Sequence, residues 1–229
     1  MSLYSNDFEH ILTTTRSVRK RLDFDRPVSQ ATIDTCLEVA LQAPTGGHAE
    51  DWRWIVISDQ KIKDDLGEIY LRNFIRYVKE PLTFSGGESD AVKGRLGGST
   101  GIEMTPRTIR MLEGAEYLAE NIHRSPYLVM PCATRPNPEF GGSGTFSALY
   151  GSVYPAIWSF HLTLRARGLG TVITTLHLYS ASEVAERLSI PNGVTQVALL
   201  PVAYTIGTDF KVADRKSLAD VRYVNGWRK

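Results

Sequence analysis

The sequence predicts an α+β or α/β fold built on about four strands, and two observations carry this prediction. Segments with apolar residues at helical spacing alternate along the chain with short runs of β-branched and aromatic residues. The chain has 229 residues, of which 42% are hydrophobic, so it is long enough to bury a full core. It shows no internal repeat or domain boundary, so we expect one domain over residues 1–229.

Helices are expected where apolar residues recur every three or four positions behind a capping residue. Ser29 precedes one such segment, which ends at Pro44. Thr105 precedes another, which has Pro106 at its first position. Further helices are expected over residues 6–15, 61–78 and 181–189.

Residues 147–166 form the longest helical candidate, and apolar side chains lie on nearly every side of it. Such a helix must be buried on all sides, in the centre of the fold or against a partner chain. Pro155 inside it predicts a kink or a second start. A glycine-rich connection is expected before it, over residues 140–147.

Strands are expected from runs of β-branched and aromatic residues. They cover residues 52–58, 126–133, 171–178 and 194–207. Cys36 and Cys132 lie in apolar contexts, one helix-like and one strand-like, so we expect buried, reduced thiols that suit a reducing compartment. The C-terminal residues after 208 are polar and are expected to be extended.

Residues 81–103 are rich in glycine and serine and poor in large apolar groups, which predicts a long mobile loop. Two interpretations stay open: a lid over a site, or a surface loop without a role. The stretch "GGSTG" at 97–101 fits the nucleophile elbow of serine hydrolases, but that elbow needs an apolar strand before it. The preceding "AVKGRL" is not such a strand, so we interpret the stretch as loop.

The overall charge argues against nucleic-acid and membrane partners. Lys and Arg total 26 and Asp and Glu total 25, so the net charge is +1 and there is no global basic field. No signal peptide opens the sequence and no apolar run approaches the ~18 residues of a membrane helix, so we expect a cytoplasmic protein. The GxGxxG, P-loop, CxxC and HExxH motifs are absent, and no metal site is implied.

A basic cluster at residues 14–22, "TTRSVRKRL", contrasts with this balance. Arg guanidinium groups offer forked donors that match phosphate oxygens, and a Ser hydroxyl adds a further hydrogen bond. The cluster therefore predicts either a phosphate clamp or a solvated surface face. Lys20 and Arg21 fit the solvated face.

Four separated blocks of the sequence resemble one protein family, in the same order. "TTRSVRKRLDFDRPV" resembles the R-R-S-x-R-x-F opening of the nitroreductase-like flavoproteins, and "ALQAPTGGHAEDWRWIVI" resembles their A-P-[ST]-x-x-N-x-Q-P-W-x-F-x-V segment. "PAIWSFHLTLRARGLGTVITTL" is similar to their long central helix and the strand after it. "LLPVAYTIGTDFKVADRKSLADV" is similar to their C-terminal block. Together the blocks span nearly the whole chain.

This resemblance implies an α+β fold with a central, mainly antiparallel sheet wrapped by helices. It also implies a homodimer with two FMN sites at the interface. Carried over residue by residue, it places Arg16, Ser17, Arg19 and Arg215 on the phosphate, the ribityl chain or the pyrimidine edge of FMN. The charge of Arg19 near N1 and O2 would favour the anionic reduced flavin.

The resemblance also implies further FMN contacts. Thr175 and Leu176 would edge the flavin ring near its reactive N5. A glycine-bearing loop would approach FMN from the partner chain, and the residues expected to do so are Pro44, Thr45, Gly47 and His48.

This chain departs from the family pattern around the same loop. His48 replaces the usual Asn, and Glu50 and Asp51 replace the common Gln-Pro pair, which adds negative charge near the cofactor loop. Thr15 replaces a second Arg, and "TTLH" at 174–177 replaces the small residues that many members place beside N5. The contacts of this loop therefore need not match those of the family.

The family chemistry takes place on the flavin, so no catalytic side chain is expected. Hydride from NADH or NADPH would reach flavin N5 and then a nitroaromatic, quinone or related conjugated acceptor, by a ping-pong mechanism. One alternative is a family relative with flavin-fragmenting, dehalogenating or cofactor-modifying chemistry. Another is a non-enzymatic protein that binds a phosphorylated ligand or nucleic acid.

Overall fold

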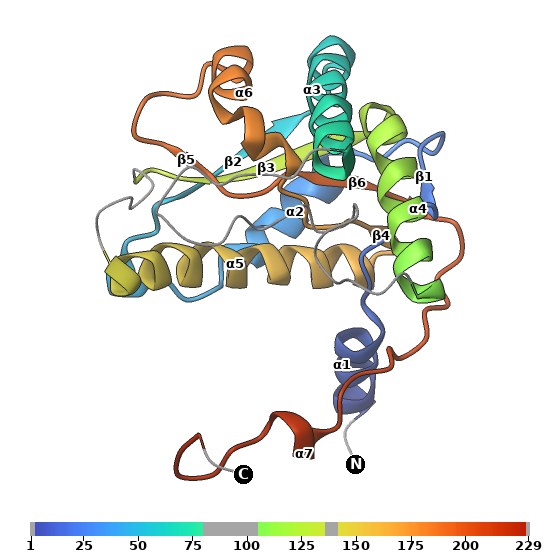
Figure 1. Cartoon of the computed structure of the whole chain (residues 1–229), viewed down its shortest axis with the longest axis vertical. Coiled ribbons are helices and arrows are strands. Elements are labelled where there is room, and N and C mark those ends of the chain that lie inside the picture. The colour runs from blue at the N-terminus through green and yellow to red at the C-terminus, as the bar shows by residue number, and fades with distance from the viewer. Residues whose placement is uncertain (1–2, 80–104, 136–141, 228–229) are drawn as a thin grey trace.

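A computed structural model describes residues 3–79, 105–135 and 142–227, and a sheet lies at its centre (Figure 1). Four strands follow one another across this sheet, namely β1 (Leu22–Asp23), β6 (Leu200–Thr205), β3 (Tyr127–Ala133) and β2 (Trp52–Ile57). Two short strands join them, β4 (Leu169–Gly170) beside β6 and β5 (Thr195–Gln196) beside β3. Every strand pairing among the described residues is antiparallel, as predicted.

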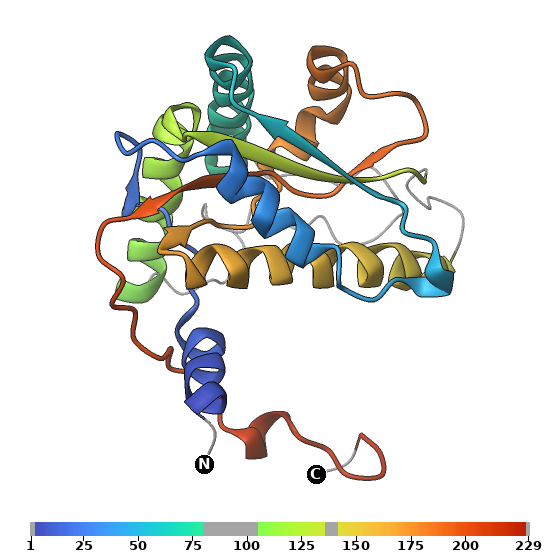
Figure 2. The ribbon, with the colours of Figure 1, turned by 180° about the vertical axis from the view of Figure 1, so that it is seen from behind.

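Helices cover both faces of the sheet (Figures 1 and 2). Those of one face are α2 (Gln30–Ala40) and α5 (Gly142–Ala166), and those of the other are α3 (Gln60–Lys79), α4 (Pro106–Asn121) and α6 (Ala181–Leu188). β3 is buried over its whole length, because successive side chains point to opposite faces and both faces are covered. Val129 packs in the core with α2 and α5, whereas Met130 packs in the core with α3 and α4.

The capped helices lie where the sequence predicts them. At the start of α2, Ser29 Oγ accepts a hydrogen bond from the Thr32 amide at 3.2 Å. At the start of α4, Thr105 Oγ1 accepts one from the Thr108 amide at 3.2 Å. These caps satisfy amides that have no partner inside the helix. The other predicted helices correspond to α1 (Leu3–Thr14), α3 and α6.

α5 is longer than predicted. It begins at Gly142, so the expected glycine-rich connection is wrong over residues 142–147. The ring of Phe146 stacks on the ring of Tyr150 one turn later, with centroids 6.3 Å apart, and this contact favours the helical spacing. The helix continues through Pro155 without the second start that the proline predicted.

Residues 171–178 do not form the predicted strand. In the described part of the chain they make one isolated bridge, at Thr174, and then enter the 3₁₀ helix η3 (Leu176–Ser180). Asn73 of α3 accounts for the turn, because its Nδ2 donates to the Leu176 carbonyl oxygen at 3.0 Å. The Leu176 carbonyl oxygen thus accepts its hydrogen bond from a side chain and not from the main chain of a neighbouring strand.

The predicted strand over 194–207 is divided by a bulge. β5 pairs Gln196 with Cys132 of β3, and β6 pairs Leu200 with Val129 of the same strand. Between these two pairs the β5–β6 segment has one residue more than β3, which is the signature of a β-bulge. The bulge ends β5 and directs the chain into β6.

Two segments project from the body on the same side (Figures 1 and 2). One is α1. The other is residues 207–227, which we call the C-terminal arm, and it contains the short helix α7 (Leu218–Val221). Ser217 and Asp220 cap α7 reciprocally, side chain to main chain in both directions. Residues 207–217 have the extended character that the sequence predicts, whereas residues 224–227 bend, so that the rings of Tyr223 and Trp227 stack with centroids 4.3 Å apart.

The predicted loop or lid at 81–103, with its "GGSTG" stretch, lies outside the described residues. Cys36 and Cys132 are buried and unpaired, as predicted. Burial raises the pKa of the Cys132 thiol to about 11, so it stays protonated. Within the described ranges, we find no helix with both the length and the apolar character needed to cross a membrane.

Candidate functional site

Arg16 follows α1 directly and binds main-chain carbonyl groups on three sides. Its guanidinium donates to the carbonyl oxygens of Thr13 at 2.7 Å and Thr15 at 2.5 Å. It also donates to the carbonyl oxygen of Lys211, in the C-terminal arm, at 2.6 Å. Arg16 therefore ties the N-terminal segment to the base of the arm, a role that the sequence motif did not reveal. One hydrogen on Nε and one on Nη1 remain for a further acceptor.

Arg215, from the C-terminal arm, lies close enough to Arg16 for their charges to interact. Burial lowers the pKa of the Arg16 guanidinium, and the positive charge of Arg215 lowers it further. Among the described residues, no carboxylate forms an ion pair with either side chain. Two like charges brought together repel each other, and an anion between them removes the repulsion. The fold thus brings together two of the residues predicted to bind a phosphate, from opposite ends of the chain.

Arg19 is half-buried between α3 and α4. Its side chain packs against Gly114 of α4, so closely that a Cβ added to Gly114 would lie 3.6 Å from Arg19 Cδ. Burial lowers the pKa of its guanidinium, and Tyr70 of α3 opposes this shift. Within the described ranges its donors have no hydrogen-bond acceptor. Arg19 is therefore a partly desolvated cation whose donors are available to a ligand.

Lys20 and Arg21 differ from each other. Lys20 is exposed and pairs with Glu113 at 3.1 Å, as expected of a solvated face. Arg21 fits that face only in part, because it is half-buried and donates to the Asp209 carbonyl oxygen at 3.0 Å. Arg21 thus holds the base of the C-terminal arm.

Ser17 is exposed and lies between two anchored neighbours. The Arg16 carbonyl oxygen is 3.2 Å from Nε2 of His161 on α5. On the other side, the Val18 amide donates to the Thr171 carbonyl oxygen at 3.0 Å. The Ser17 hydroxyl has no hydrogen-bond partner in the part of the chain that the structure describes. This hydroxyl is consequently available to an external ligand.

The loop of Pro44 and Thr45 leads into the 3₁₀ turn η1 (Gly46–His48), which lies at the opposite end of α5 from α1 (Figure 2). The Gly46 amide donates to Ser152 Oγ on α5 at 3.0 Å. Ser152 and His161 are separated by roughly 14 Å along α5, at the usual rise per residue. The structure therefore does not bring this loop to Arg16 and Ser17 within one chain.

The backbone of this loop adopts left-handed conformations. The φ angle is 64° at Gly47, where glycine permits it, but it is also 51° at His48 and 43° at Glu50. Side chains disfavour such angles, and residues held there concentrate at functional sites. Pro44, Gly47 and His48 are exposed, so the loop presents these residues outward.

Asp51 changes the expected charge of the loop. Its side chain is mostly buried and forms an ion pair with Arg135. Its carbonyl oxygen accepts hydrogen bonds from the amide and the hydroxyl of Thr134, at 2.8 Å and 3.1 Å. The negative charge expected from Glu50 and Asp51 is thus reduced to that of Glu50, because Arg135 neutralises the second carboxylate.

Thr175 is exposed and Leu176 half-buried where the chain enters η3. Asn73, which holds the Leu176 carbonyl, is itself held by Ser180, whose hydroxyl donates to its Oδ1 at 3.1 Å. The sequence analysis did not single out Asn73. The available signal was its position on the otherwise apolar face of α3, beside Tyr70.

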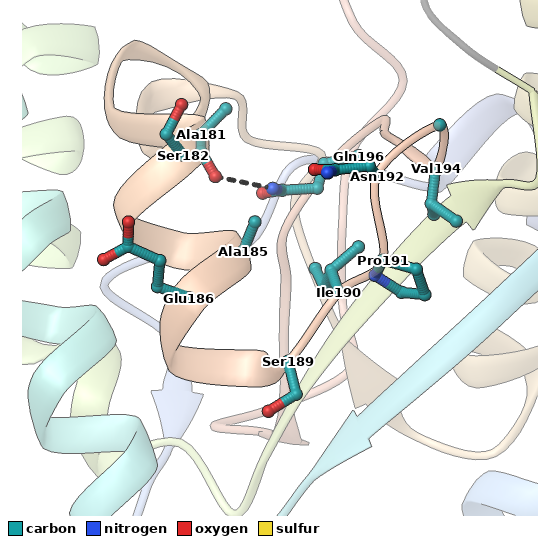
Figure 3. A pocket seen from close by; sticks show the side chains of 11 residues that line it. Ala181, Ser182, Ala185, Glu186, Ser189, Ile190, Pro191, Asn192, Val194 and Gln196 are labelled. Atoms are coloured by element: carbon teal, nitrogen blue, oxygen red, sulfur yellow. Dashed lines mark hydrogen bonds between the residues drawn. The ribbon is translucent and has the colours of Figure 1, made fainter.

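A cavity of about 550 Å³ lies between α6 and residues 189–196 (Figure 3). Gln196 reaches from β5 toward α6 and donates through Nε2 to the Ala181 carbonyl oxygen at 2.8 Å. None of the site residues predicted from the sequence lines this cavity. It is therefore separate from the candidate site. No group of three His, Cys, Asp or Glu side chains in the described ranges is placed to hold a metal ion.

One family model matches most of this chain. The family model described as the nitroreductase family matches residues 12–204. The chain belongs to the nitroreductase family. This match includes the basic cluster, the Pro44–His48 loop and the start of η3, whereas Arg215 lies beyond it.

Similar solved structures include an FMN-dependent protein and a protein bound to FMN. One is the FMN-dependent nitroreductase NfnB from Mycobacterium smegmatis in complex with NADPH, with 18% identity and a TM-score of 0.66 over 97% of this chain and all of that chain. The other is iodotyrosine deiodinase bound to FMN and 3-iodo-L-tyrosine, with the same identity and TM-score over 97% of this chain and 99% of that chain. A BluB-like flavoprotein from Clostridium difficile 630 shares 18% identity with a TM-score of 0.63 over 99% of this chain and 100% of that chain. These similarities show the nitroreductase fold, a mixed arrangement of helices around an antiparallel sheet.

A curated relative is similar over a shorter stretch. Iodotyrosine deiodinase 1 from Rattus norvegicus is 33% identical over 69 residues, which are 30% of this chain and 24% of that protein. The match thus spans about a quarter of the length of this relative.

Proposed function

We propose that this member of the nitroreductase family is an FMN-dependent oxidoreductase that takes hydride from NADH or NADPH and reduces a nitroaromatic, a quinone or a related conjugated acceptor. The convergence of Arg16 and Arg215, without a paired carboxylate among the described residues, is the observation that carries the proposal. Two guanidinium groups that lie close together without a carboxylate partner suit a dianionic phosphate such as that of FMN. When bound, FMN supplies the hydride chemistry, which explains why no catalytic side chain is needed.

Each residue of the candidate site has a distinct part in this proposal. Arg16, Arg215 and the free hydroxyl of Ser17 bind the phosphate. Arg19 lies further along the chain with unused donors and a charge that it keeps near neutral pH, so it suits the ribityl chain or the pyrimidine edge of the flavin. Thr175 and Leu176, whose turn is fixed by Asn73, lie beside the reactive edge of the ring.

We also propose that the site is completed in a homodimer. Phe146, Tyr150, Tyr154 and Trp158 follow one another at four-residue spacing on α5, and we call this row the aromatic ladder. The ring centroids of Phe146 and Tyr150 lie 6.3 Å apart, and those of Tyr150 and Tyr154 lie 6.0 Å apart. Three of the four members are exposed. A second copy covering the ladder would bury this surface and bring its own Pro44, Thr45, Gly47 and His48 toward Arg16. The single-domain organisation of residues 1–229 is part of the same proposal.

The phosphate assignment is tested by replacing Arg215, because Arg16 also holds the base of the arm. Arg215→Ala should weaken FMN binding by about 1.5–3 kcal/mol, the size of a hydrogen bond to a charged group. Riboflavin, which lacks the phosphate, should bind with nearly unchanged affinity. Lys20→Ala, which removes an exposed charge paired with Glu113, is the matched control and should change neither affinity. Equilibrium dialysis measures both, and equal affinities of the variant and the unaltered protein for FMN would overturn the assignment.

A reductive dehalogenase is the second candidate, because iodotyrosine deiodinase is similar both in sequence and in fold. NAD(P)H consumption measured with a nitroaromatic, a quinone and a halogenated phenol separates the two. Release of halide, with little turnover of the other acceptors, would favour dehalogenation. A purified protein without flavin absorbance and without affinity for FMN would instead favour a non-enzymatic binding protein.

A further inference from the structure

His161 lies on α5 directly behind the segment that carries Arg16 and Ser17. Its side chain is 3% exposed, and its Nε2 is 3.2 Å from the Arg16 carbonyl oxygen. The ring of Trp158, the last member of the aromatic ladder, meets the His161 ring edge-on with centroids 5.2 Å apart. His161 thus lies between the ladder and the candidate phosphate site.

The hydrogen-bonding role of His161 follows from its burial. Burial lowers the pKa of the imidazole to about 4, so near neutral pH the ring carries a single proton. A carbonyl oxygen can only accept, so this proton lies on Nε2 and is donated to Arg16. Nδ1 is then a buried acceptor, and in the described ranges no donor reaches it. The Arg16 carbonyl oxygen is thus the one hydrogen-bond partner of the His161 ring among the described residues.

Fixing this carbonyl also fixes the amide that follows it. The peptide group is planar and trans, so the Ser17 N–H points away from the Arg16 carbonyl oxygen, and hence away from His161. The next amide, that of Val18, is held inward by the Thr171 carbonyl at 3.0 Å. Ser17 is therefore fixed on both sides, with its N–H and hydroxyl turned outward.

We infer that His161 is a positioning residue that orients the Arg16–Ser17 peptide so that the Ser17 N–H and hydroxyl face the phosphate of the bound flavin. This inference rests on the FMN site proposed above. The competing explanation is that His161 only fills the space beneath Trp158. A substitution that keeps an aromatic ring but removes the donor separates the two explanations.

The experiment compares His161→Phe with His161→Gln. Phe keeps a ring against Trp158 but cannot donate, whereas the Gln amide nitrogen reaches the position of Nε2. The Kd of His161→Phe for FMN should rise by about tenfold, while its Kd for riboflavin should change by less than about twofold. His161→Gln should restore FMN affinity to within about threefold. Thr163→Val, a buried change on the same helix, is the control and should alter neither Kd.

Hydrogen exchange on the flavin-free protein gives a second measurement that needs no cofactor. Amides of residues 15–19 should exchange faster in His161→Phe than in the unaltered protein, and at the unaltered rate in His161→Gln. Equal losses of FMN and riboflavin affinity in His161→Phe, or an unchanged exchange rate, would overturn the inference. If the unaltered protein itself fails to bind FMN, the proposed function fails, and the phosphate role of His161 fails with it.

Discussion

His177 is an ionisable side chain with no exposed surface, two residues beyond Thr175. Burial lowers its pKa to about 3, and in the described ranges neither ring nitrogen has a hydrogen-bond partner. A neutral imidazole enclosed in this way costs free energy, because its polar atoms lose water without gaining a partner. Burial likewise lowers the pKa of His161, on the other face of the sheet, to about 4, although its Nε2 has the Arg16 carbonyl oxygen as a partner.

These two histidines make the protein sensitive to acid. Their pKa values in the folded chain lie below the ordinary value of 6.5, so between pH 6.5 and about 4 the unfolded chain binds protons that the folded chain does not. The free energy of unfolding should therefore fall as the pH drops through this range, by up to about 1.4 kcal/mol per pH unit for each histidine. His177→Leu should remove about one proton from the difference between the unfolded and folded chains, and so make the unfolding free energy depend less steeply on pH. Urea unfolding at pH 7, 6 and 5 measures the slope, and the exposed His10→Gln variant should keep it.

The left-handed backbone at Glu50 gives a second prediction at this scale. Glu50→Gly should raise the free energy of unfolding by about 1 kcal/mol, because glycine adopts a φ of 43° without steric cost. The neighbouring Ala49 has a φ of −71°, so Ala49→Gly should instead lower it by about 0.5–1 kcal/mol. Chemical denaturation of both variants checks the pair. Equal effects of the two substitutions would show that the loop is not strained at Glu50.

The sequence revealed the charged residues of the candidate site but not the side chains that fix the main chain of the site. Arg16 and Arg215 could be named because they belong to blocks that resemble a family. His161 and Asn73 could not, because each is a lone polar residue in an apolar helical pattern, and such a pattern does not say which carbonyl group the side chain meets. That information depends on how α3 and α5 pack against distant segments.

At the scale of single elements, α5 combines a buried face with the exposed aromatic ladder. Val153, Ile157 and Phe160 are fully buried against the sheet, whereas Trp158 is 40% exposed on the opposite side. The sequence therefore reads as apolar all round, although one side of the helix has no cover within the described part of the chain. We interpret the uncovered side as a subunit contact.

Replacement of Trp158 tests this contact. Trp158→Ser should shift the protein from dimer toward monomer, because it removes a large aromatic group from the aromatic ladder at the proposed interface. Ile75→Ser, at a residue of α3 that is 42% exposed on the other side of the sheet, is the control and should leave the dimer intact. Light scattering at several protein concentrations measures both. An unchanged dimer in Trp158→Ser would contradict the proposed interface.

The elements that the sequence predicted well are those with local signals. Ser29 and Thr105 mark the starts of α2 and α4, and each forms the expected cap. The two strand errors lie where a non-local contact decides the structure. Asn73 redirects the chain at Leu176, and the pairing of β5 and β6 with β3 requires an extra residue that no local pattern announces.

At the scale of the whole molecule, the C-terminal arm leaves the body with little apolar cover. Its exposed apolar residues are Val212, Leu218, Val221, Val224 and Trp227, the last with 84% of its surface exposed. Five such side chains on one projecting segment would find their apolar contacts on a second copy of the chain. The arm also carries Arg215, so in the proposed function dimer formation and FMN binding depend on the same segment.

Truncation after Lys211 tests the arm. The shortened chain should keep its far-UV circular dichroism and lose less than about 1 kcal/mol of unfolding free energy, because most of the removed residues that the structure describes are exposed. It should be monomeric by light scattering and should no longer retain FMN. Lys216→Ala in the full-length chain is the control and should remain dimeric. A truncated protein that stays a flavin-bound dimer would refute the assignment of the arm.

The base of the arm is held by three arginines that bind main-chain oxygens. Arg165, Arg21 and Arg16 donate to the carbonyl oxygens of residues 208, 209 and 211, respectively. Phe210 adds a side-chain contact, with its ring centroid 4.1 Å from the Arg21 guanidinium carbon and 4.9 Å from that of Arg165. Carbonyl oxygens are the same in every amino acid, so the direction in which the arm departs is independent of most of its residues. Substitutions in the outer arm should therefore leave its path unchanged, although replacing Arg215 would still remove the proposed phosphate contact.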